Sequence, residues 1–394
     1  MGAPITDRAS STIRRGNLRD IVVLWVLSRV LFEGLSLATV AVAGPADDRE
    51  PGFFGLLHHW DSNWFDAIMR AGYLGPSYVD IDDPGARASF FPGYPLLARA
   101  VAWVLGGGHV TTGSGRIALW LIPFVASFVA AVFLYRTVEP RFGTSIARWS
   151  TGLLLFGPYA VFLAASYSEA LFLAFAIGAW WALVNKRPVL AGVLAAGASF
   201  SRINGVFLAL ALIVLYLQQQ RADGARVKIG ALAGLSLSFA GTAAYLGWLW
   251  ARTGDATFWL SAQSGRFARE ATWPWQALIN AIKLPVHDPR FDYKVQYTAE
   301  LLAAVVLVAA VVAFVRTREW AATTYLVLSL FSLVTNVSYQ SLARNSITMF
   351  PVFVLAAVIV VRSRRRWAVY CGLTVAGAFT LLNTMLFSLG YWAD

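Results

Sequence analysis

Apolar residues occur along this chain in long runs that are separated by short polar or basic segments. The runs near 21–44, 117–135, 229–251, 298–315 and 367–390 reach or approach the about 20 residues that a helix needs to cross a bilayer. Further apolar runs near 149–164, 167–184, 188–200, 203–219, 320–337 and 346–361 bring the expected number of spans to about eleven. Because a lipid-exposed segment must satisfy its own backbone hydrogen bonds, these Gly- and Ala-rich runs favour helices. The pattern predicts an all-α polytopic membrane protein.

The net charge of +11 alone would suggest a nucleic-acid ligand, but its distribution follows the predicted spans. Basic residues form short clusters between apolar runs, for example "RSRRR" at 362–366. Placing all these clusters on the cytoplasmic side satisfies the positive-inside rule, so we expect no nucleic-acid partner. This topology predicts a basic cytoplasmic tail over 1–20, a single membrane domain over 21–394, and large outer loops near 45–116 and 252–297. The short apolar segment 94–107 is then an interfacial or re-entrant helix.

The unusual polar residues fall on the outer side of this predicted topology. The first outer loop contains "HHWDSNWFDAIMRAGY" at 58–73, and later segments bring further charged or amide groups to helix ends. Ionisable groups at membrane depth are costly and usually line a cavity or pathway. We therefore expect an outer-face site, whose candidate residues are His58, His59, Trp60, Asp61, Trp64, Glu169, Arg202, Asn204, His287 and Arg344.

Asp61 is the candidate general base, because a carboxylate beside a membrane-level cleft can accept a proton; its alternative role is a helix N-cap. Arg202 and Arg344 are candidate phosphate clamps, because guanidinium matches phosphate oxygens in a two-pronged geometry; alternatively they only extend to the interface. Glu169 fits a supporting role, and His287 lies in a loop where a structural role is the stronger interpretation. We expect no metal, since the histidine spacing is poor and cysteine ligands are missing.

Four segments resemble, in order, the PIG-V family of mannosyltransferases. "HHWDSNWFDAIMRAGY" with "FFPGYPLLARAVAWVLG" resembles the start of that family. "LAASYSEALFLAFAIGAWWAL", "AAGASFSRINGVFLAL" and "LARNSITMFPVFVLAA" resemble its later segments. The sequence departs from the family pattern at His59, where arginine is common, and at Asn345, where tyrosine is usual.

The resemblance implies a GT-C type of fold and an inverting glycosyltransferase without a cofactor, with Asp61 as its base. The implied partners are a polyprenyl-phosphate sugar, typically mannose, and a lipid or glycolipid acceptor such as a phosphatidylinositol mannoside or lipoglycan. The Ala-, Gly- and Arg-rich composition suggests a bacterial plasma membrane with the site on its extracytoplasmic side. The alternatives are a transporter or flippase of a lipid-linked saccharide and a non-catalytic membrane subunit.

Overall fold

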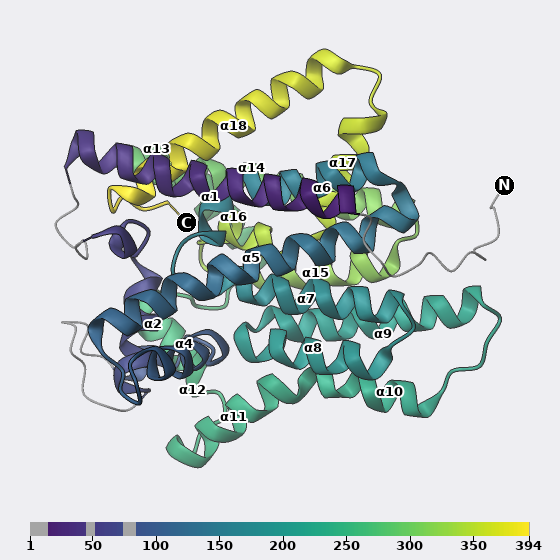
Figure 1. The fold of residues 1–394 in the computed structure, drawn as a ribbon, viewed down its shortest axis with the longest axis horizontal. Coiled ribbons are helices and arrows are strands. Elements are labelled where there is room, and N and C mark those ends of the chain that lie inside the picture. Colours follow the sequence, from purple (N-terminus) through teal and green to yellow (C-terminus); the bar gives the residue numbers. More distant parts are fainter. Residues whose placement is uncertain (1–14, 45–51, 74–83, 394) are drawn as a thin grey trace.

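The computed structural model describes residues 15–44, 52–73 and 84–393, and this part of the chain is helical throughout apart from connections (Figure 1). The first half contains α1 (Arg15–Ala43), η1 (Phe53–Gly55), α2 (Asp61–Ala71), α3 (Pro84–Arg87), α4 (Gly93–Leu105), α5 (Thr112–Phe142), α6 (Thr144–Phe156), η2 (Ala160–Leu163), α7 (Glu169–Val184) and α8 (Pro188–Ser201). The second half contains α9 (Asn204–Ala222), α10 (Ile229–Ser236), η3 (Leu237–Phe239), α11 (Ala240–Thr253), α12 (Phe258–Phe267), α13 (Pro274–His287), α14 (Phe291–Arg316), α15 (Trp320–Val334), α16 (Leu342–Asn345), η4 (Ser346–Thr348), α17 (Pro351–Arg362) and α18 (Arg366–Ser388). The all-α prediction is confirmed.

Six helices of the described chain are long and apolar enough to cross a membrane, and there are seven if the bent pair 342–348 and 351–362 is one broken span. Four shorter apolar helices, α4, α7, α8 and α15, accompany them. The expected number of about eleven spans is therefore not confirmed. One reason is visible at the predicted span 149–164, where α6 ends at Phe156 and η2 follows after Gly157 and Pro158. Proline lacks the N–H that a continuing helix needs and restricts the residue before it.

Two further predicted segments, 94–107 and 1–20, can be compared with the helices of the structure. The segment 94–107 forms the 13-residue helix α4. Most of the predicted tail 1–20 lies outside the described residues, and its last part, from Arg15, already belongs to α1.

Small residues allow the central helices to approach one another closely. The face of α8 that carries Ala191, Ala195 and Ala198 is fully buried. A Cβ atom added at Gly192 would lie 1.9 Å from the Gly234 carbonyl oxygen, so α8 and α10 touch through backbone at this point. Such contacts are typical of membrane helix packing, where close backbone approach replaces the hydrophobic effect as the driving force.

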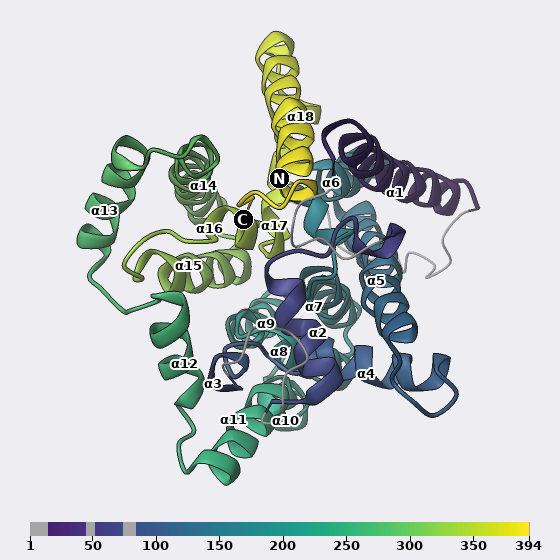
Figure 2. The ribbon, with the colours of Figure 1, turned by 90° about the vertical axis from the view of Figure 1, so that its left-hand side faces the viewer.

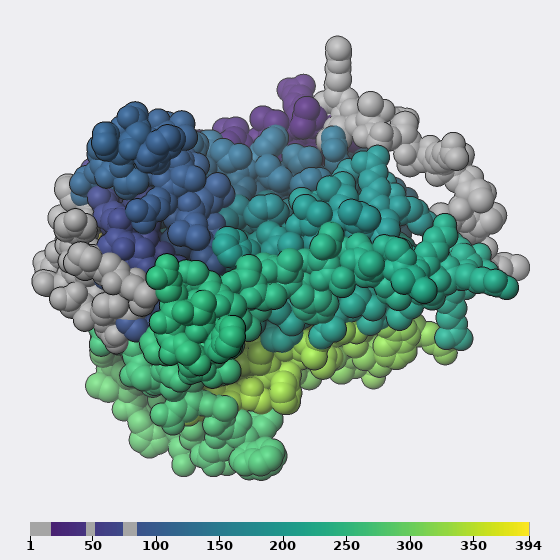
Figure 3. Space-filling model, turned by 90° about the horizontal axis from the view of Figure 1, so that it is seen from below, coloured from purple at the N-terminus to yellow at the C-terminus, as the bar shows by residue number. Residues whose placement is uncertain are grey.

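The two ends of the helix bundle carry different elements: short helices at one end and basic connections at the other. Most of the long helices run roughly along the horizontal direction of Figure 1, with α2, α4, α12 and α13 toward one end and the basic α9–α10 and α17–α18 connections toward the other. Figure 2 looks onto the first end, where α2, α3 and α12 surround the ends of α8, α9 and α15. Figure 3 shows the green surface near residues 250–270 at the same end as the blue surface of the first loop. The candidate site lies at this end.

Candidate active site

A constrained turn aims Asp61 at its neighbours. Trp60 precedes α2 with a φ of 54°, a left-handed conformation that is costly for a bulky residue. The Tyr167 hydroxyl donates to the His59 carbonyl oxygen (3.1 Å) and accepts from the Asp61 backbone N–H (3.2 Å), and so holds both sides of this turn. Trp60 is the N-cap residue of α2 and Asp61 is its first helical residue, so Asp61 does not have the alternative role of N-cap. Its side chain is 23% exposed, and its Oδ2 accepts from Arg344 Nη1 at 2.8 Å.

Arg344 is the buried centre of the site. Its side chain is only 5% exposed. Its Nη1 contacts Asp61, and its Nε lies 3.4 Å from Glu169 Oε1. The guanidinium also lies over the rings of Phe162 and Tyr167, at 5.5 and 5.3 Å from the ring centroids. Cation–π contacts of this kind favour a cation that has lost much of its water. These contacts fix the guanidinium between two carboxylates.

The backbone that carries Arg344 is held from α14. Ser341 is the N-cap residue before α16 and has a φ of 60°. The Ala343 backbone N–H donates to Glu300 Oε2 at 2.7 Å. Glu300 is 1% exposed, so a buried carboxylate from a distant helix stabilises the first turn of α16. This contact sets the position from which Arg344 reaches Asp61.

Glu169 joins two arginines from different segments. It begins α7, is fully buried, and lies 2.9 Å from Arg202 Nη1 as well as beside Arg344. Arg202 connects α8 to α9, and its Nη1 also donates to the Ser168 hydroxyl at 2.9 Å. Its Nη2 donates to Asn345 Oδ1 at 2.6 Å. The result is a continuous chain of contacts from Asp61 through Arg344 and Glu169 to Arg202. Such a network holds its groups in place before a ligand arrives.

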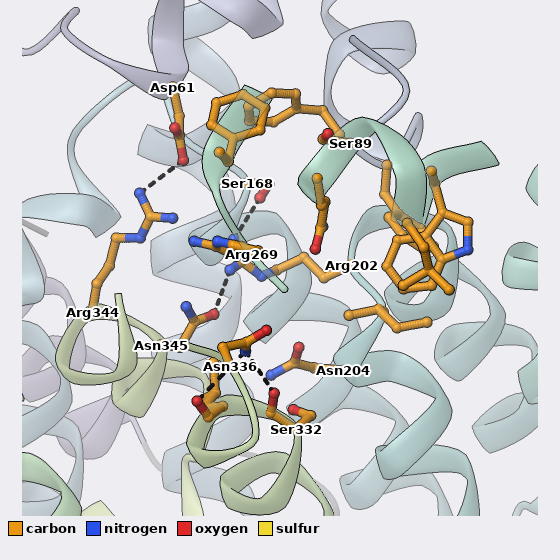
Figure 4. Close-up of a pocket in the computed structure, with 18 of the residues that line it drawn as sticks. Asp61, Ser89, Ser168, Arg202, Asn204, Arg269, Ser332, Asn336, Arg344 and Asn345 are labelled. Atoms are coloured by element: carbon orange, nitrogen blue, oxygen red, sulfur yellow. Dashed lines mark hydrogen bonds and ion pairs between the residues drawn. The ribbon is translucent and has the colours of Figure 1, made fainter. Parts of the chain in front are cut away.

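A cavity of about 360 Å³ opens onto this network (Figure 4). Of the predicted site residues, Asp61, Arg202, Asn204 and Arg344 line it, and Glu169 lies behind the two arginines. Asn204 Nδ2 donates to Thr348 Oγ1 at 3.4 Å. The polar part of the wall further includes Ser89, Ser168, Ser201, Gln263, Arg269, Ser332, Thr335, Asn336 and Asn345. The apolar part is formed by Phe65, Phe90, Phe91, Ile203, Phe207, Trp259, Leu260, Phe267, Ala271 and Leu333.

Several guanidinium groups line the cavity. Arg202, Arg269 and Arg344 are in its wall together with Asp61, and Glu169 lies behind Arg202 and Arg344. Guanidinium donors of this kind suit an anionic ligand, and phosphate in particular.

The structure does not bring the predicted histidines to the cavity wall. His58 is buried, and burial lowers the pKa of its imidazole to about 4. His59 is fully buried, with its ring edge-on to Phe387 at 5.6 Å. His287 is exposed at the end of α13, where its Nδ1 lies 2.8 Å from the Lys283 carbonyl oxygen. None of the three histidines therefore lines the cavity.

The two predicted tryptophans have packing contacts. Trp60 is 39% exposed and donates from Nε1 to the Tyr391 carbonyl oxygen at 3.2 Å. Trp64 is buried, stacks on Phe90 at 5.8 Å and meets Phe267 edge-on at 5.6 Å. Since Phe90 and Phe267 line the cavity, Trp64 supports the aromatic wall from behind.

The sequence analysis did not propose the other polar residues of the cavity wall, and Asn345 and Arg269 are two of them. Asn345 had a signal, because it follows Arg344 directly and departs from the family pattern. Arg269 had none, because nothing in the sequence distinguishes it from the other arginines of the second outer loop. Among the described residues, no group of three or more His, Cys, Asp or Glu side chains is placed to hold a metal ion.

The fold resembles that of solved membrane proteins. Two structures of the oligosaccharyltransferase of Archaeoglobus fulgidus, one in the apo form and one in complex with an inhibitory peptide and a dolichol-phosphate, align with 96% of this chain and 56% of theirs. The TM-score is 0.50 and the sequence identity is 12% in both cases. This likeness shows the fold alone: over the aligned part, the chain shares the all-helical membrane fold of these oligosaccharyltransferase structures.

The family similarity is independent of that comparison. The sequence profile of the family described as Mannosyltransferase (PIG-V) matches residues 31–222. GPI alpha-1,6-mannosyltransferase 2 of Cricetulus griseus is 30% identical over 178 residues, and that of Mus musculus is 31% identical over 175 residues. These alignments cover 44% and 42% of this chain and only 34% and 33% of the relatives. The predicted resemblance to the PIG-V family is thus confirmed for the part that contains Asp61, Glu169 and Arg202.

Proposed function

We propose that this protein transfers a mannosyl residue from polyprenyl-phosphate-mannose to a membrane-associated acceptor. The observation that carries the proposal is the cavity, whose wall combines the Asp61 carboxylate, three guanidinium groups and several aromatic rings within a membrane protein. A lipid-linked sugar phosphate has three matching parts: a hydroxylated sugar, an anion and a hydrocarbon chain. The similarity to PIG-V mannosyltransferases supports mannose as the sugar, and the dolichol-phosphate bound to a protein of the same fold supports the donor class.

Asp61 has the position that a general base requires. The acceptor hydroxyl attacks C1 of the sugar, the new C1–O bond forms, and the bond from C1 to the phosphate oxygen breaks with inversion. The proton of the hydroxyl passes to Asp61, and the leaving phosphate takes the bonding electron pair. Arg344 engages Oδ2 of Asp61 and orients the carboxylate, while Oδ1 is not engaged by that contact. No covalent sugar–enzyme intermediate is needed, as in inverting glycosidases.

The arginines stabilise the charge that develops on the leaving phosphate. Arg202 and Arg344 are held in place by Glu169, so their donors do not need to reorganise during the reaction. Electrostatic stabilisation by preorganised groups is usually the largest contribution to catalysis. Asp61 thus provides the base and Arg344 orients it. Arg202, at the other end of the chain of contacts through Glu169, is the cation available to the departing phosphate.

The acceptor and the side of the membrane are part of the same proposal. The relatives are named GPI mannosyltransferases, which supports a glycosylated phosphatidylinositol, such as a phosphatidylinositol mannoside, or a lipoglycan as acceptor. The basic connections at the end opposite the cavity support an extracytoplasmic site in a plasma membrane, and the composition supports a bacterial one.

The test compares purified wild type with Asp61→Asn, using radiolabelled polyprenyl-phosphate-mannose and a pool of lipid acceptors. We expect transfer by wild type and a rate about 10²- to 10⁴-fold lower in the variant, which is the usual contribution of a general base. His287→Gln is the control, because this residue is exposed and away from the cavity. Equal rates for Asp61→Asn and wild type would remove Asp61 from its role. Absence of wild-type transfer, with donor movement across vesicles instead, would favour a flippase.

A further inference from the structure

The segment that follows α18 folds back onto α14. Gly390 has a φ of 75°, a conformation that glycine adopts readily after a helix end, and the Tyr391 backbone N–H donates back into the last turn of α18 at 3.0 Å. Trp392 is buried against Tyr293 and Tyr297 of α14, with the ring centroids 4.8 and 5.1 Å apart. In Figure 2 this segment (yellow, marked C) lies beside α14. Residues 389–393 are therefore attached to both helices.

This segment also holds the residue that precedes Asp61. The Tyr391 carbonyl oxygen accepts from the indole Nε1–H of Trp60 at 3.2 Å. Trp60 has the left-handed φ of 54°, and a bulky residue keeps such a conformation only when the surrounding structure holds it. Tyr167 holds the backbone of the turn through the His59 carbonyl oxygen and the Asp61 N–H. The Tyr391 contact adds a hold on the side chain of the strained residue itself.

The end of α18 further contacts the rings around Arg344. Phe387 is buried, and its ring meets His59, next to the strained turn, edge-on at 5.6 Å. The same ring lies 5.2 and 5.8 Å from the rings of Phe162 and Tyr167, over which the Arg344 guanidinium is placed. One helix end therefore contacts both the turn before α2 and the aromatic support of the arginine.

The contact between Asp61 and Arg344 depends on such shared supports. The two residues are 283 positions apart in the chain, and their side chains meet at 2.8 Å. α14 supports the Arg344 side through Glu300, which accepts from the backbone of α16. It supports the Asp61 side through the two tyrosine rings that seat Trp392. The segment 389–393 thus connects the turn before α2 to the helix that also holds α16.

We propose that Trp60 is a positioning residue for Asp61, and that the segment 389–393, anchored by Trp392, is its support. This inference rests on the proposed function, in which Asp61 takes the proton of the acceptor hydroxyl. The hydrogen bond from the indole to Tyr391 keeps the turn in the conformation that directs the carboxylate. A displacement of about 1 Å at a reacting group can cost about 10²-fold in rate. Trp60 therefore acts through Asp61 and not through contact with the sugar.

The test uses the full chain in detergent. Trp60→Phe keeps a ring and removes the Nε1–H donor, Trp392→Ala removes the anchor, and Trp392→Phe keeps a ring in its place. Trp367→Phe is the matched control, because Trp367 is exposed in the first turn of α18, at the opposite end of that helix. The kcat for transfer and the KM values for donor and acceptor are measured separately. Hydrogen exchange of the peptide that contains residues 58–63 is followed by mass spectrometry, which needs no substrate.

We expect Trp60→Phe to lower kcat by about 10-fold, the effect of one lost hydrogen bond, and Trp392→Ala to lower it by about 10- to 100-fold. Both KM values should stay as in wild type, and exchange of 58–63 should become faster in the same two variants. Trp392→Phe should restore kcat and exchange toward wild type, and Trp367→Phe should change neither. In an Asp61→Asn background, Trp60→Phe should cause no further loss of kcat, because residues that act as a unit are not additive.

Three results would overturn the inference. A full further loss in the Asp61→Asn background would show that Trp60 does not act through Asp61. A raised KM with unchanged kcat would make Trp60 a substrate contact, and unchanged exchange of 58–63 in Trp60→Phe would show that Tyr391 does not hold the turn.

The two proposals fail in different ways. If wild type transfers no mannose but exchange of 58–63 becomes faster in Trp60→Phe and Trp392→Ala, the proposed reaction is wrong and the support of the turn stands. If wild type transfers mannose and Trp60→Phe does so with the same kcat, the reaction stands and Trp60 is not a positioning residue.

Discussion

Glu169 offers the sharpest test of how the site is held together. It is fully buried, 2.9 Å from Arg202 and 3.4 Å from Arg344, whose side chains are 15% and 5% exposed. Glu169→Gln keeps the volume and one acceptor oxygen but removes the charge. The two guanidinium groups of Arg202 and Arg344 then remain in a poorly hydrated place without the carboxylate that joins them. Removing one partner of a buried ion pair typically costs about 3–5 kcal/mol, and we expect about 3 kcal/mol because the amide oxygen still accepts a hydrogen bond.

The assay is reversible unfolding in detergent micelles, followed by tryptophan fluorescence. Asp223→Asn is the matched control, because Asp223 pairs with Lys186 where both side chains are about half exposed; a pair of this kind contributes about 0–1 kcal/mol. In the double variant Glu169→Gln with Arg202→Gln, one of the uncompensated cations is removed. The double variant should therefore lose about 1–3 kcal/mol less unfolding free energy than the sum of the losses in the two single variants. A Glu169→Gln protein as stable as the Asp223→Asn protein would refute the reasoning.

Two further predictions concern the surroundings of the site. Burial lowers the pKa of His58 to about 4, below the about 6.5 of an unfolded chain, so the unfolded state binds more protons between these values. Stability should fall by up to about 3 kcal/mol as the pH drops from 6.5 to 4, and denaturation curves of His58→Gln should lack this part of the pH dependence. A Cβ atom at Gly93 would lie 2.5 Å from Ser201 Oγ and 2.9 Å from Ser201 Cα. We therefore expect Gly93→Ala to destabilise the protein by about 1–3 kcal/mol and, because Arg202 is the next residue, to slow transfer. Gly113→Ala, which has no atom within 4 Å, should do neither, and unfolding and transfer assays on both variants test this.

Only part of the site could be predicted from the sequence, because residue types differ in how strongly their position along the chain indicates a function. Asp61, Glu169, Arg202, Asn204 and Arg344 are polar groups at the ends of apolar runs, where a charge is costly without a function. The structure places all five in or directly behind one cavity. The three candidate histidines are not in the cavity wall: His58 and His59 are buried in its surroundings, and His287 is exposed at the end of α13.

The pattern of apolar runs by itself determined the all-helical membrane class, because a chain in lipid must satisfy its backbone within each segment. It did not determine the number of spans. The break at Gly157–Pro158 has a local cause in proline, but the 83° bend between 342–348 and 351–362 is a feature of the tertiary structure. The convergence of Arg269, Arg344 and Arg202 was likewise decided only by the tertiary structure. Backbone pairing of 270–272 with 335–337 and the contact of Glu300 with α16 join segments far apart in the chain, and no local sequence pattern encodes such contacts.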